Sequence, residues 1–335
     1  MKKLLKPTFV FLCMCGGLTL TGCHKERPEA EVAKSDIVFT ISGGSDDATR
    51  ATAPVAESDV NEWCLYIADA DGVICDAVST SSLSVTRTLP NGSYTVYAAV
   101  NCGLEPGSVS GVADILSHER RLEDEGDGLS MFGATDFFVS DGAYCAIPVR
   151  RLVSKVVIRK MSVDFSKSPD IAAKSFSLDA VYLINVCGGS VLQDGWSFVP
   201  QSWYDRRERQ AGAADALIHD SVGVTMTSGQ SHDVQHVFYA YQNNTVADSR
   251  AETWSPRHTR LVVECTLGGE KTYYPIDIVG SDGRLARNSL YTVNELVVTG
   301  YGSTHPDLPV VGPLPYRLSA AVMDWEGTHI IEEIF

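Results

Sequence analysis

The segment DIVFTIS, residues 36–42, alternates between two kinds of side chain. Ile37, Phe39 and Ile41 fall on one face of an extended chain, because successive side chains of a strand point to opposite sides. This alternation predicts a β-strand with one buried face. If all three side chains are buried, each contributes roughly 1.5–3 kcal/mol, and the strand contributes about 5–9 kcal/mol, which is comparable with the net stability of a domain.

A polar stretch separates this strand from the next one, which is expected at 62–68. Residues 42–58, SGGSDDATRATAPVAES, hold a single cationic side chain, Arg50, among small, polar and acidic residues. Taken alone, the stretch is typical of a solvated surface loop. The lone arginine acquires a more specific interpretation only from the rest of the chain.

The remaining sequence is punctuated into short extended runs. Asn91-Gly92 precedes an alternating run and favours a hairpin turn. A helix is expected at 112–122, where helix-forming residues carry an apolar stripe, and a loop or excursion at 201–227. Further strands are expected at 137–139, 144–149, 152–165, 177–186, 234–241, 261–267, 272–278 and 291–299.

These patterns predict an all-β chain with a minor helix. The chain exceeds the roughly 100 residues of one β-sandwich, so two tandem sandwiches are the more economical arrangement. We place an N-terminal sandwich domain at 36–148 and a C-terminal sandwich domain, with a C-terminal tail, at 149–335.

The first residues predict export. Three lysines precede an apolar run, residues 7–20, which leads into LTGC ending at Cys23. This is the pattern of a bacterial lipoprotein signal peptide, here 1–22, after which the thiol of Cys23 carries a diacylglycerol. The run is shorter than the roughly 20 residues that a membrane-spanning helix needs. Residues 23–35 are charged and small, without a hydrophobic period, and are interpreted as a tether.

The charge balance bears on the partners. The whole chain has a formal net charge of −15, and loss of the three signal-peptide lysines leaves 24 Lys and Arg against 42 Asp and Glu, a charge of −18. Nucleic acid is therefore not expected as a partner. No later apolar run is long enough to cross a bilayer, so a lipid on Cys23 is the only membrane attachment that the sequence offers.

Six cysteines remain after the signal peptide and Cys23 are set aside. An even number in an exported chain permits disulfides, but most of these residues sit singly in apolar runs, where a thiol packs as a small hydrophobe. Cys64 and Cys75 flank the turn at 69–72 and are the preferred pair if a disulfide forms. The sequence leaves the two alternatives open.

A search for catalytic patterns finds no nucleophile elbow, phosphate-binding loop or dinucleotide fingerprint. His232 and His236 have the spacing of a helical zinc pair, but in an extended chain they would lie roughly 13 Å apart on one face. We therefore expect neither an enzyme nor a metal or cofactor site.

Several phrases together resemble the Bacteroidales fimbrillin superfamily, the type V pilus subunits and their relatives. Their order and spacing cover nearly the whole chain. They are LTGC before residue 24, TRA at 49–51, LPNGSYTVYAAVN at 89–101, IPVRRLVSKVVI at 147–158, HVFYAYQNN at 236–244, LARNSLYTVNELVVTG at 285–300, and a closing segment with AVMDWEG.

The resemblance implies two transthyretin-like sandwich domains, a lipoprotein exported to the outer membrane and cell surface, and other fimbrial subunits as partners. It also implies assembly by strand exchange after an arginine-specific surface protease cuts the linker behind the first strand. The position that matches the cut is Arg50-Ala51. Ile37, Phe39 and Ile41 would then belong to the displaceable strand.

A donor strand is expected near the C-terminus. Tyr316, Leu318, Ala320 and Val322 alternate with other residues, and Ile331 and Phe335 share a face of the last run. The alternative is that these are simply the final strands of the C-terminal domain. The proline-rich approach at 305–315 favours a segment that extends away from the body.

Three functions remain open at this point. The first is a stalk or tip subunit of a fimbria that serves cell adhesion. The second is a fimbrial anchor that keeps its lipid and its first strand. The third is a surface lipoprotein that binds glycan through Trp196, Trp203 and Trp254, although aromatic residues in β-rich chains more often belong to the core.

Overall fold

The computed structural model describes residues 33–43, 57–248, 256–308, 314–325 and 330–334. The elements described below all belong to one compact unit, Lys34–Phe335. The N-terminal half holds the elements β1 Lys34–Ser42, β2 Trp63–Asp69, β3 Ile74–Thr80, β4 Ser84–Pro90, β5 Gly92–Val100, α1 Val112–Ser117, β6 Glu119–Arg121, η1 Leu122–Asp127, β7 Met131–Val139, β8 Tyr144–Pro148 and β9 Arg150–Arg151.

The C-terminal half begins with β10. Its elements are β10 Val153–Ile158, β11 Met161–Val163, α2 Pro169–Ala172, β12 Phe176–Ile184, β13 Val186–Cys187, β14 Gly189–Val191, β15 Trp203–Tyr204, α3 Asp215–Ile218, β16 His219–Met226, β17 Ser231–His232, β18 His236–Tyr241, β19 Arg260–Leu267, β20 Glu270–Asp277, β21 Ser289–Val298, β22 Tyr316–Asp324 and β23 Ile330–Ile334. Strands dominate and the helices are short, which confirms the expected all-β chain with a minor helix.

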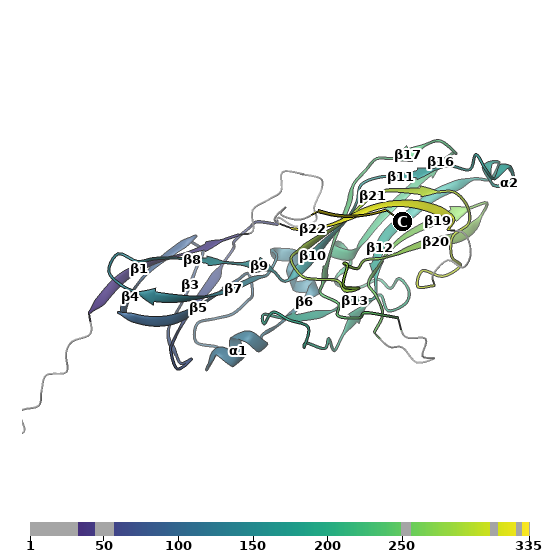
Figure 1. Ribbon diagram of the computed structural model, residues 1–335. Coiled ribbons are helices and arrows are strands. Elements are labelled where there is room, and N and C mark those ends of the chain that lie inside the picture. The colour runs from purple at the N-terminus through teal and green to yellow at the C-terminus, as the bar shows by residue number, and fades with distance from the viewer. Residues whose placement is uncertain (1–32, 44–56, 249–255, 309–313, 326–329, 335) are drawn as a thin grey trace, which may run out of the picture. The chain divides into compact units, whose positions relative to one another are not determined.

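The N-terminal strands form a sandwich. A three-stranded sheet has the order β4-β1-β8, and a five-stranded sheet has the order β3-β2-β5-β7-β9 (Figure 1). Apolar side chains of both sheets share one buried cluster, in which Ile37 and Phe39 of β1 join Trp63, Leu65 and Val96 of the larger sheet. The packing of two sheets through their apolar faces is what strand-by-strand alternation requires.

The C-terminal strands form a second sandwich. One sheet has the order β16-β12-β19-β20, and the facing sheet runs β17-β11-β21-β10-β18, with β22 paired to β21 and β23 paired to β22. The core includes Val156 and Val293 from the second sheet and Val181 and Val263 from the first. The chain passes from the first sandwich to the second between Arg151 and Val153. β9 still pairs with β7 of the first, whereas β10 pairs with β18 and β21 of the second.

One local expectation is right only in part and another is wrong, because tertiary pairing prevails over local preference. The expected helix at 112–122 ends at Ser117, and β6 pairs with β14 instead. The expected loop at 201–227 contains β15, α3 and β16, and β16 pairs with β12 along most of its length. Alternation of Val222, Val224 and Met226 was the sequence signal for that strand.

The expected hairpin at Asn91-Gly92 is also absent from the described sheets. The strand before this turn, β4, pairs with β1, and the strand after it, β5, pairs with β2 and β7. The turn therefore carries the chain from one sheet of the sandwich to the other. A turn sequence specifies a reversal of direction, but it does not specify which neighbour each strand takes.

Candidate strand-exchange site

The first strand occupies the middle of its sheet. β1 pairs antiparallel with β4, from Lys34 opposite Pro90 to Thr40 opposite Ser84, and parallel with β8 from Val38 onward. Both edges of β1 are therefore hydrogen-bonded. Its removal would leave unpaired backbone groups on both neighbouring strands, which is an unfavourable state that another extended segment could relieve.

The side chains of β1 follow the predicted alternation. Ile37 and Phe39 are 0% exposed, and Val38 between them is 39% exposed. Phe39 packs edge-to-face on Phe137, with ring centroids 5.9 Å apart. Ile41 is only half-buried, so two fully buried side chains contribute about 3–6 kcal/mol and the third contributes less. The estimate of about 5–9 kcal/mol for three fully buried side chains was therefore too high.

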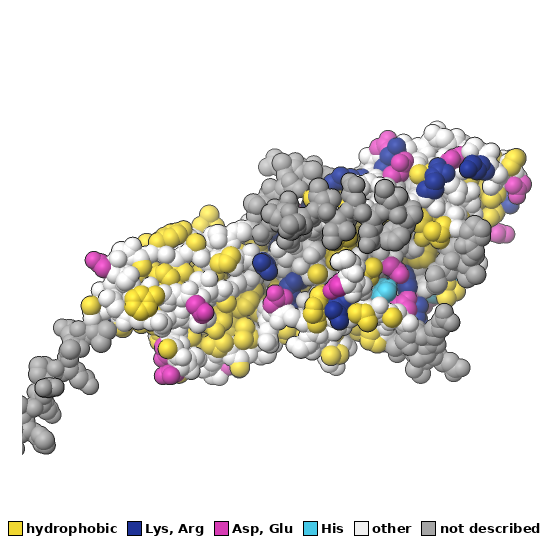
Figure 2. All heavy atoms as spheres, in the orientation of Figure 1, with side chains coloured by type: hydrophobic (Ala, Val, Ile, Leu, Met, Phe, Trp, Pro, Cys, Tyr) yellow, Lys and Arg dark blue, Asp and Glu magenta, His cyan; other side chains and the backbone are white. Residues whose placement is uncertain are grey.

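The surface around β1 carries few charges. Figure 2 shows hydrophobic side chains, in yellow, over much of the visible face in the region of β1, β4 and β5. Val38 of β1 and Tyr144 of β8 are among the large hydrophobic residues with exposed side chains. An apolar, weakly charged surface of this kind presents little electrostatic opposition to a second extended segment.

The chain after the linker has its own buried anchor. Arg50 and Ala51 lie outside the described residues, as does Cys23. The described chain resumes at Glu57, which is 7% exposed, and its carboxylate accepts a hydrogen bond from the Tyr239 hydroxyl at 2.6 Å and pairs with Lys155 Nζ at 2.6 Å. A cut in the linker would therefore separate β1 from a segment that stays fixed to the C-terminal sheet.

The candidate donor residues form a strand of their own sheet. β22 runs antiparallel to β21, and the backbone of Val322 pairs with that of Ile331 in β23. Tyr316, Leu318, Ala320 and Val322 are each partly buried. The structure thus shows the arrangement of final strands that the sequence left as the alternative. Phe335 lies outside the described residues.

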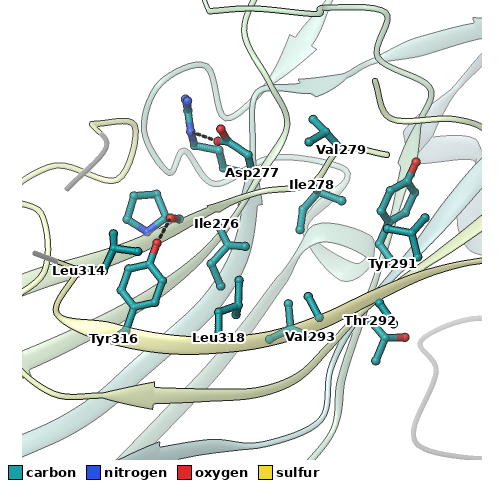
Figure 3. Close-up of a pocket in the computed structure, with 15 residues that line it drawn as sticks. Ile276, Asp277, Ile278, Val279, Tyr291, Thr292, Val293, Leu314, Tyr316 and Leu318 are labelled. Carbon is teal, nitrogen blue, oxygen red and sulfur yellow. Dashed lines mark hydrogen bonds and ion pairs between the residues drawn. The ribbon is translucent and has the colours of Figure 1, made fainter. Parts of the chain in front are cut away.

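A cavity lies beneath β22. It has a volume of about 400 Å³ and is bordered by β20 on one side and by β22 on the other. Ile276, Ile278 and Leu318 point into the same space in Figure 3. Tyr316 closes one part of it, where its hydroxyl donates a hydrogen bond to the Pro275 carbonyl at 3.4 Å. The packing of β22 against the opposite sheet is therefore incomplete, and unfilled volume weakens dispersion contacts.

The chain before β22 is fixed by buried charges. Asp307 is 3% exposed, pairs with Arg257 Nε at 2.6 Å and with Arg260, and accepts a hydrogen bond from Asn185 at 2.8 Å. Burial by itself would lower the pKa of Arg260, but Asp277 and the neighbouring carboxylates outweigh that effect, and the pKa is raised. Asp307 is thus held in a charge network that resists local opening.

The chain after β22 is fixed by an aromatic side chain. Trp325 is 2% exposed, and its backbone N–H donates to the Asn288 carbonyl at 3.1 Å. The indole stacks on Tyr239 with centroids 5.9 Å apart, and the Arg151 guanidinium lies 4.4 Å from its centroid. Tyr239 also binds Glu57, so the segment after the linker and the end of β22 meet in one buried cluster. Its members are Glu57, Arg151, Lys155, Tyr239 and Trp325.

The sequence did not identify this cluster as a site. The phrase AVMDWEG contained Trp325, but nothing in the local pattern linked it to Glu57, because the two residues come from opposite ends of the chain. A lone glutamate at the end of a polar linker has no periodicity from which burial could be predicted. Only the tertiary structure joins them.

The histidine pair differs from its extended-chain expectation. The chain turns between β17 and β18, so the rings of His232 and His236 lie 5.4 Å apart rather than far along one strand. His236 Nδ1 contacts the Asp220 carboxylate at 2.6 Å. Among the described residues, no group of three or more His, Cys, Asp or Glu side chains is arranged to hold a metal ion.

The preferred disulfide does not form. Cys64 and Cys75 are both free thiols, as are the other four cysteines of the described chain. Cys64 lies opposite Ser79 at the start of the β2–β3 pair, whereas Cys75 lies near the turn. The two residues flank the turn at unequal distances, so strand register separates them.

The structure describes two of the three tryptophans that the sequence offered for glycan binding. Trp203 packs against the hydrophobic core, whereas Trp196 is 36% exposed. Trp254 lies outside the described residues. Of the two that are described, Trp196 presents an exposed aromatic face of the kind that stacks on a ligand.

The chain shares its fold with solved structures of fimbrial and adhesion-related proteins. It matches a fimbrilin from Porphyromonas gingivalis W83 with a TM-score of 0.64 at 16% identity, over 87% of this chain and 97% of that one. It matches a candidate cell adhesion protein from Bacteroides eggerthii with a TM-score of 0.65 at 15% identity, over 90% and 98% of the two chains. The tip fimbrial protein Mfa3 from Porphyromonas gingivalis, solved with a C-terminal truncation, gives a TM-score of 0.54 at 13% identity, over 88% and 100%.

No protein-family model and no curated protein sequence matches the chain. At these identities the structural matches establish the fold. Within the described part of the chain, none of the helices has both the length and the apolar character needed to cross a membrane.

Proposed function

We propose that this chain is a fimbrial subunit, in the stalk or at the tip, which joins its neighbours by strand exchange and contributes to cell adhesion. The observation that carries the proposal is the position of β1, a central strand paired with β4 and β8 and followed by a linker and then by a segment with its own buried contacts. Cleavage at Arg50-Ala51 would sever the lipid-bearing first strand, and a strand from another subunit would then replace it. The shared fold with fimbrial structures supports this assignment.

The space that β1 occupies between β4 and β8, here called the slot, restricts the geometry of a donor strand. An incoming strand that reproduces the pairing of β1 runs antiparallel to β4 and parallel to β8, with apolar side chains two residues apart where Ile37 and Phe39 now lie. The run Tyr316, Leu318 and Ala320 has that spacing. A cut alone does not eject β1, because its hydrogen bonds and buried side chains persist until a competitor displaces them.

The lipid and the protease complete the proposal. Cys23 would carry the acyl chains that hold the precursor at the outer membrane, and an arginine-specific surface protease would release the subunit. N-terminal sequencing of the chain recovered from surface fibres tests both steps. A start at Ala51 supports cutting and exchange, whereas an acylated Cys23 in the fibre supports the anchor function and contradicts cutting.

A cross-linking experiment tests the exchange itself. Cys145 is a buried free thiol directly opposite Phe39 in the β1–β8 register, so it faces the slot. In fibres of a Cys75→Ser background, Ala320→Cys or Leu318→Cys should form an intersubunit disulfide with Cys145. Ser319→Cys, on the exposed face of β22, is the matched control. Equal cross-linking by the control, or cross-links that survive Cys145→Ser, would contradict the exchange.

A further inference from the structure

A second, smaller pocket is lined by no residue of β1 or β22, although its lining includes Asn288, whose carbonyl accepts the Trp325 N–H. It has a volume of about 200 Å³, and its lining includes Trp196, Arg150, Arg287, Gln242 and Asp194. The pocket combines one aromatic ring with two guanidinium groups.

The aromatic wall of the pocket is held in place. Trp196 is 36% exposed, its carbonyl accepts a hydrogen bond from the Asn244 amide at 2.9 Å, and the adjacent Gly195 carbonyl accepts one from Gln242 at 2.7 Å. The Arg284 guanidinium lies 5.2 Å from the centroid of the indole. The loop that carries the indole is therefore fixed by side chains of the segment after β18, and the ring retains accessible surface for stacking.

The guanidinium of Arg287 is buried at the floor of the pocket with little negative charge near it. The Arg287 side chain is 9% exposed and donates to four neutral acceptors, namely Gln242 Oε1, the Leu192 and Val191 carbonyls and Ser190 Oγ. These bonds use four of the five N–H groups that a guanidinium carries. The one carboxylate within ion-pairing distance, among the described residues, is Asp194, at 3.8 Å and with a side chain that is 74% exposed.

Arg260 and Arg287 are both buried but differ in the carboxylates beside them. Arg260 is buried to a similar extent but pairs with Asp248, Asp277 and Asp307, and its pKa is raised. Burial lowers the pKa of Arg287, and the opposing effect of the Asp194 carboxylate is too small to cancel it. A buried charge without close counter-charges is costly, and a ligand anion would reduce that cost.

From this geometry we propose that the pocket binds an acidic sugar, a pyranose ring that bears a carboxylate. Trp196 provides the surface for the ring, and the exposed Arg150 together with Arg287 provides charge for the carboxylate. The exposed Asp194 carboxylate borders the same pocket and can accept hydrogen bonds from hydroxyl groups of the ring, whereas Gln242 orients Arg287 and the Gly195 carbonyl. This site would add carbohydrate recognition to the chain, and it does not depend on strand exchange.

Matched small ligands test the proposal on the full chain. Methyl β-D-glucuronide and methyl β-D-glucoside differ only in the carboxylate, and glutarate supplies carboxylate without a ring. Isothermal titration or ligand-observed NMR should give a Kd for the glucuronide about tenfold or more below that for the glucoside, as expected for a charge-assisted contact. Glutarate should bind more weakly than the glucuronide by a similar factor.

Substitutions locate the binding. Trp196→Ala and Arg150→Ala should each weaken glucuronide binding by about fivefold or more, and Trp196→Phe should restore part of the loss. Phe138→Ala and Arg159→Ala, which change an exposed aromatic residue and an exposed arginine elsewhere, should leave the Kd unchanged. Equal binding of the glucoside or of glutarate, no detectable binding of the glucuronide, or losses that the control variants share would overturn the proposal.

Discussion

β1 and β22 differ in how their faces are packed. β1 pairs with β4 from Lys34 to Thr40 and with β8 from Val38 to Ser42, and two of its side chains are fully buried. β22 lies over an incompletely filled cavity with partly buried side chains, and buried residues fix the chain at each end, Asp307 before it and Trp325 after it. β22 also has partners on both edges, β21 along Tyr316–Asp324 and β23 along Ser319–Met323. The two strands therefore differ in how completely their faces are packed, and β22 depends more on the residues that fix its ends.

The largest expected effect concerns the face of β1. Phe39→Ala in the full chain should lower the free energy of unfolding by about 3–5 kcal/mol, because a fully buried aromatic side chain is replaced by a cavity. Val38→Ala, on the exposed face of the same strand, should change it by less than about 0.5 kcal/mol. Urea unfolding measures both. Similar losses for the two variants would show that β1 is not held by its buried face.

The second effect concerns an end of β22. Trp325→Ala should destabilise the chain by up to about 3 kcal/mol, below the full value for a buried aromatic residue, because β22 can open locally. Hydrogen exchange should become faster in β22 while β1 keeps its protection. Trp196→Ala provides the matched control for a partly exposed tryptophan. If hydrogen exchange in β1 became faster to the same degree, β1 and β22 would not be stabilised independently of each other.

The third effect concerns the face of β22. Leu318→Ala should cost only about 1–2 kcal/mol, at or below the low end for leucine truncation, because the side chain is partly buried and already borders a cavity. Comparison with Phe39→Ala by urea unfolding sharpens the contrast between the two strands. A loss as large as that for Phe39 would mean that β22 is also held by its face.

The smallest effect concerns pH. A hydrogen bond with Asp277 raises the pKa of His258, so the folded pKa lies above the unfolded one. Its contribution to stability is complete below the unfolded pKa and is lost as the pH rises through the folded pKa. Because Asp277 also binds Arg260, which holds Asp307, the effect reaches the first anchor of β22, at a magnitude on the order of 0.5 kcal/mol.

The measurement compares thermal unfolding at about pH 5 and about pH 8, which bracket the titration of histidine. His258→Gln should be less sensitive to this change than the unaltered chain. His118→Gln offers a control, since the His118 ring contacts the Cys102 carbonyl at 2.9 Å and not a member of this charge network. If the thermal stability of His258→Gln changed with pH as much as that of the unaltered chain, titration of His258 would not explain the pH dependence.

Local pattern was enough for some elements and insufficient for others. Alternation predicted β1 and its buried face within two residues, because a strand at the middle of a sheet has one periodic apolar side. Helix-forming composition at 112–122 and the turn signal at Asn91-Gly92 were less reliable, because the partner strands there come from distant parts of the chain. The sequence left the pairing of Cys64 and Cys75 open, because their separation depends on strand register.

The sequence by itself determined the all-β character, the alternating face of the first strand and the polar linker after it, since these depend on periods of two residues and on local composition. The tertiary structure decided which strands pair, how Glu57 and Trp325 meet, and where Trp196 comes close to Arg150 and Arg287. The physical reason is that such contacts arise from sheet packing between residues far apart in the chain. No local period encodes them.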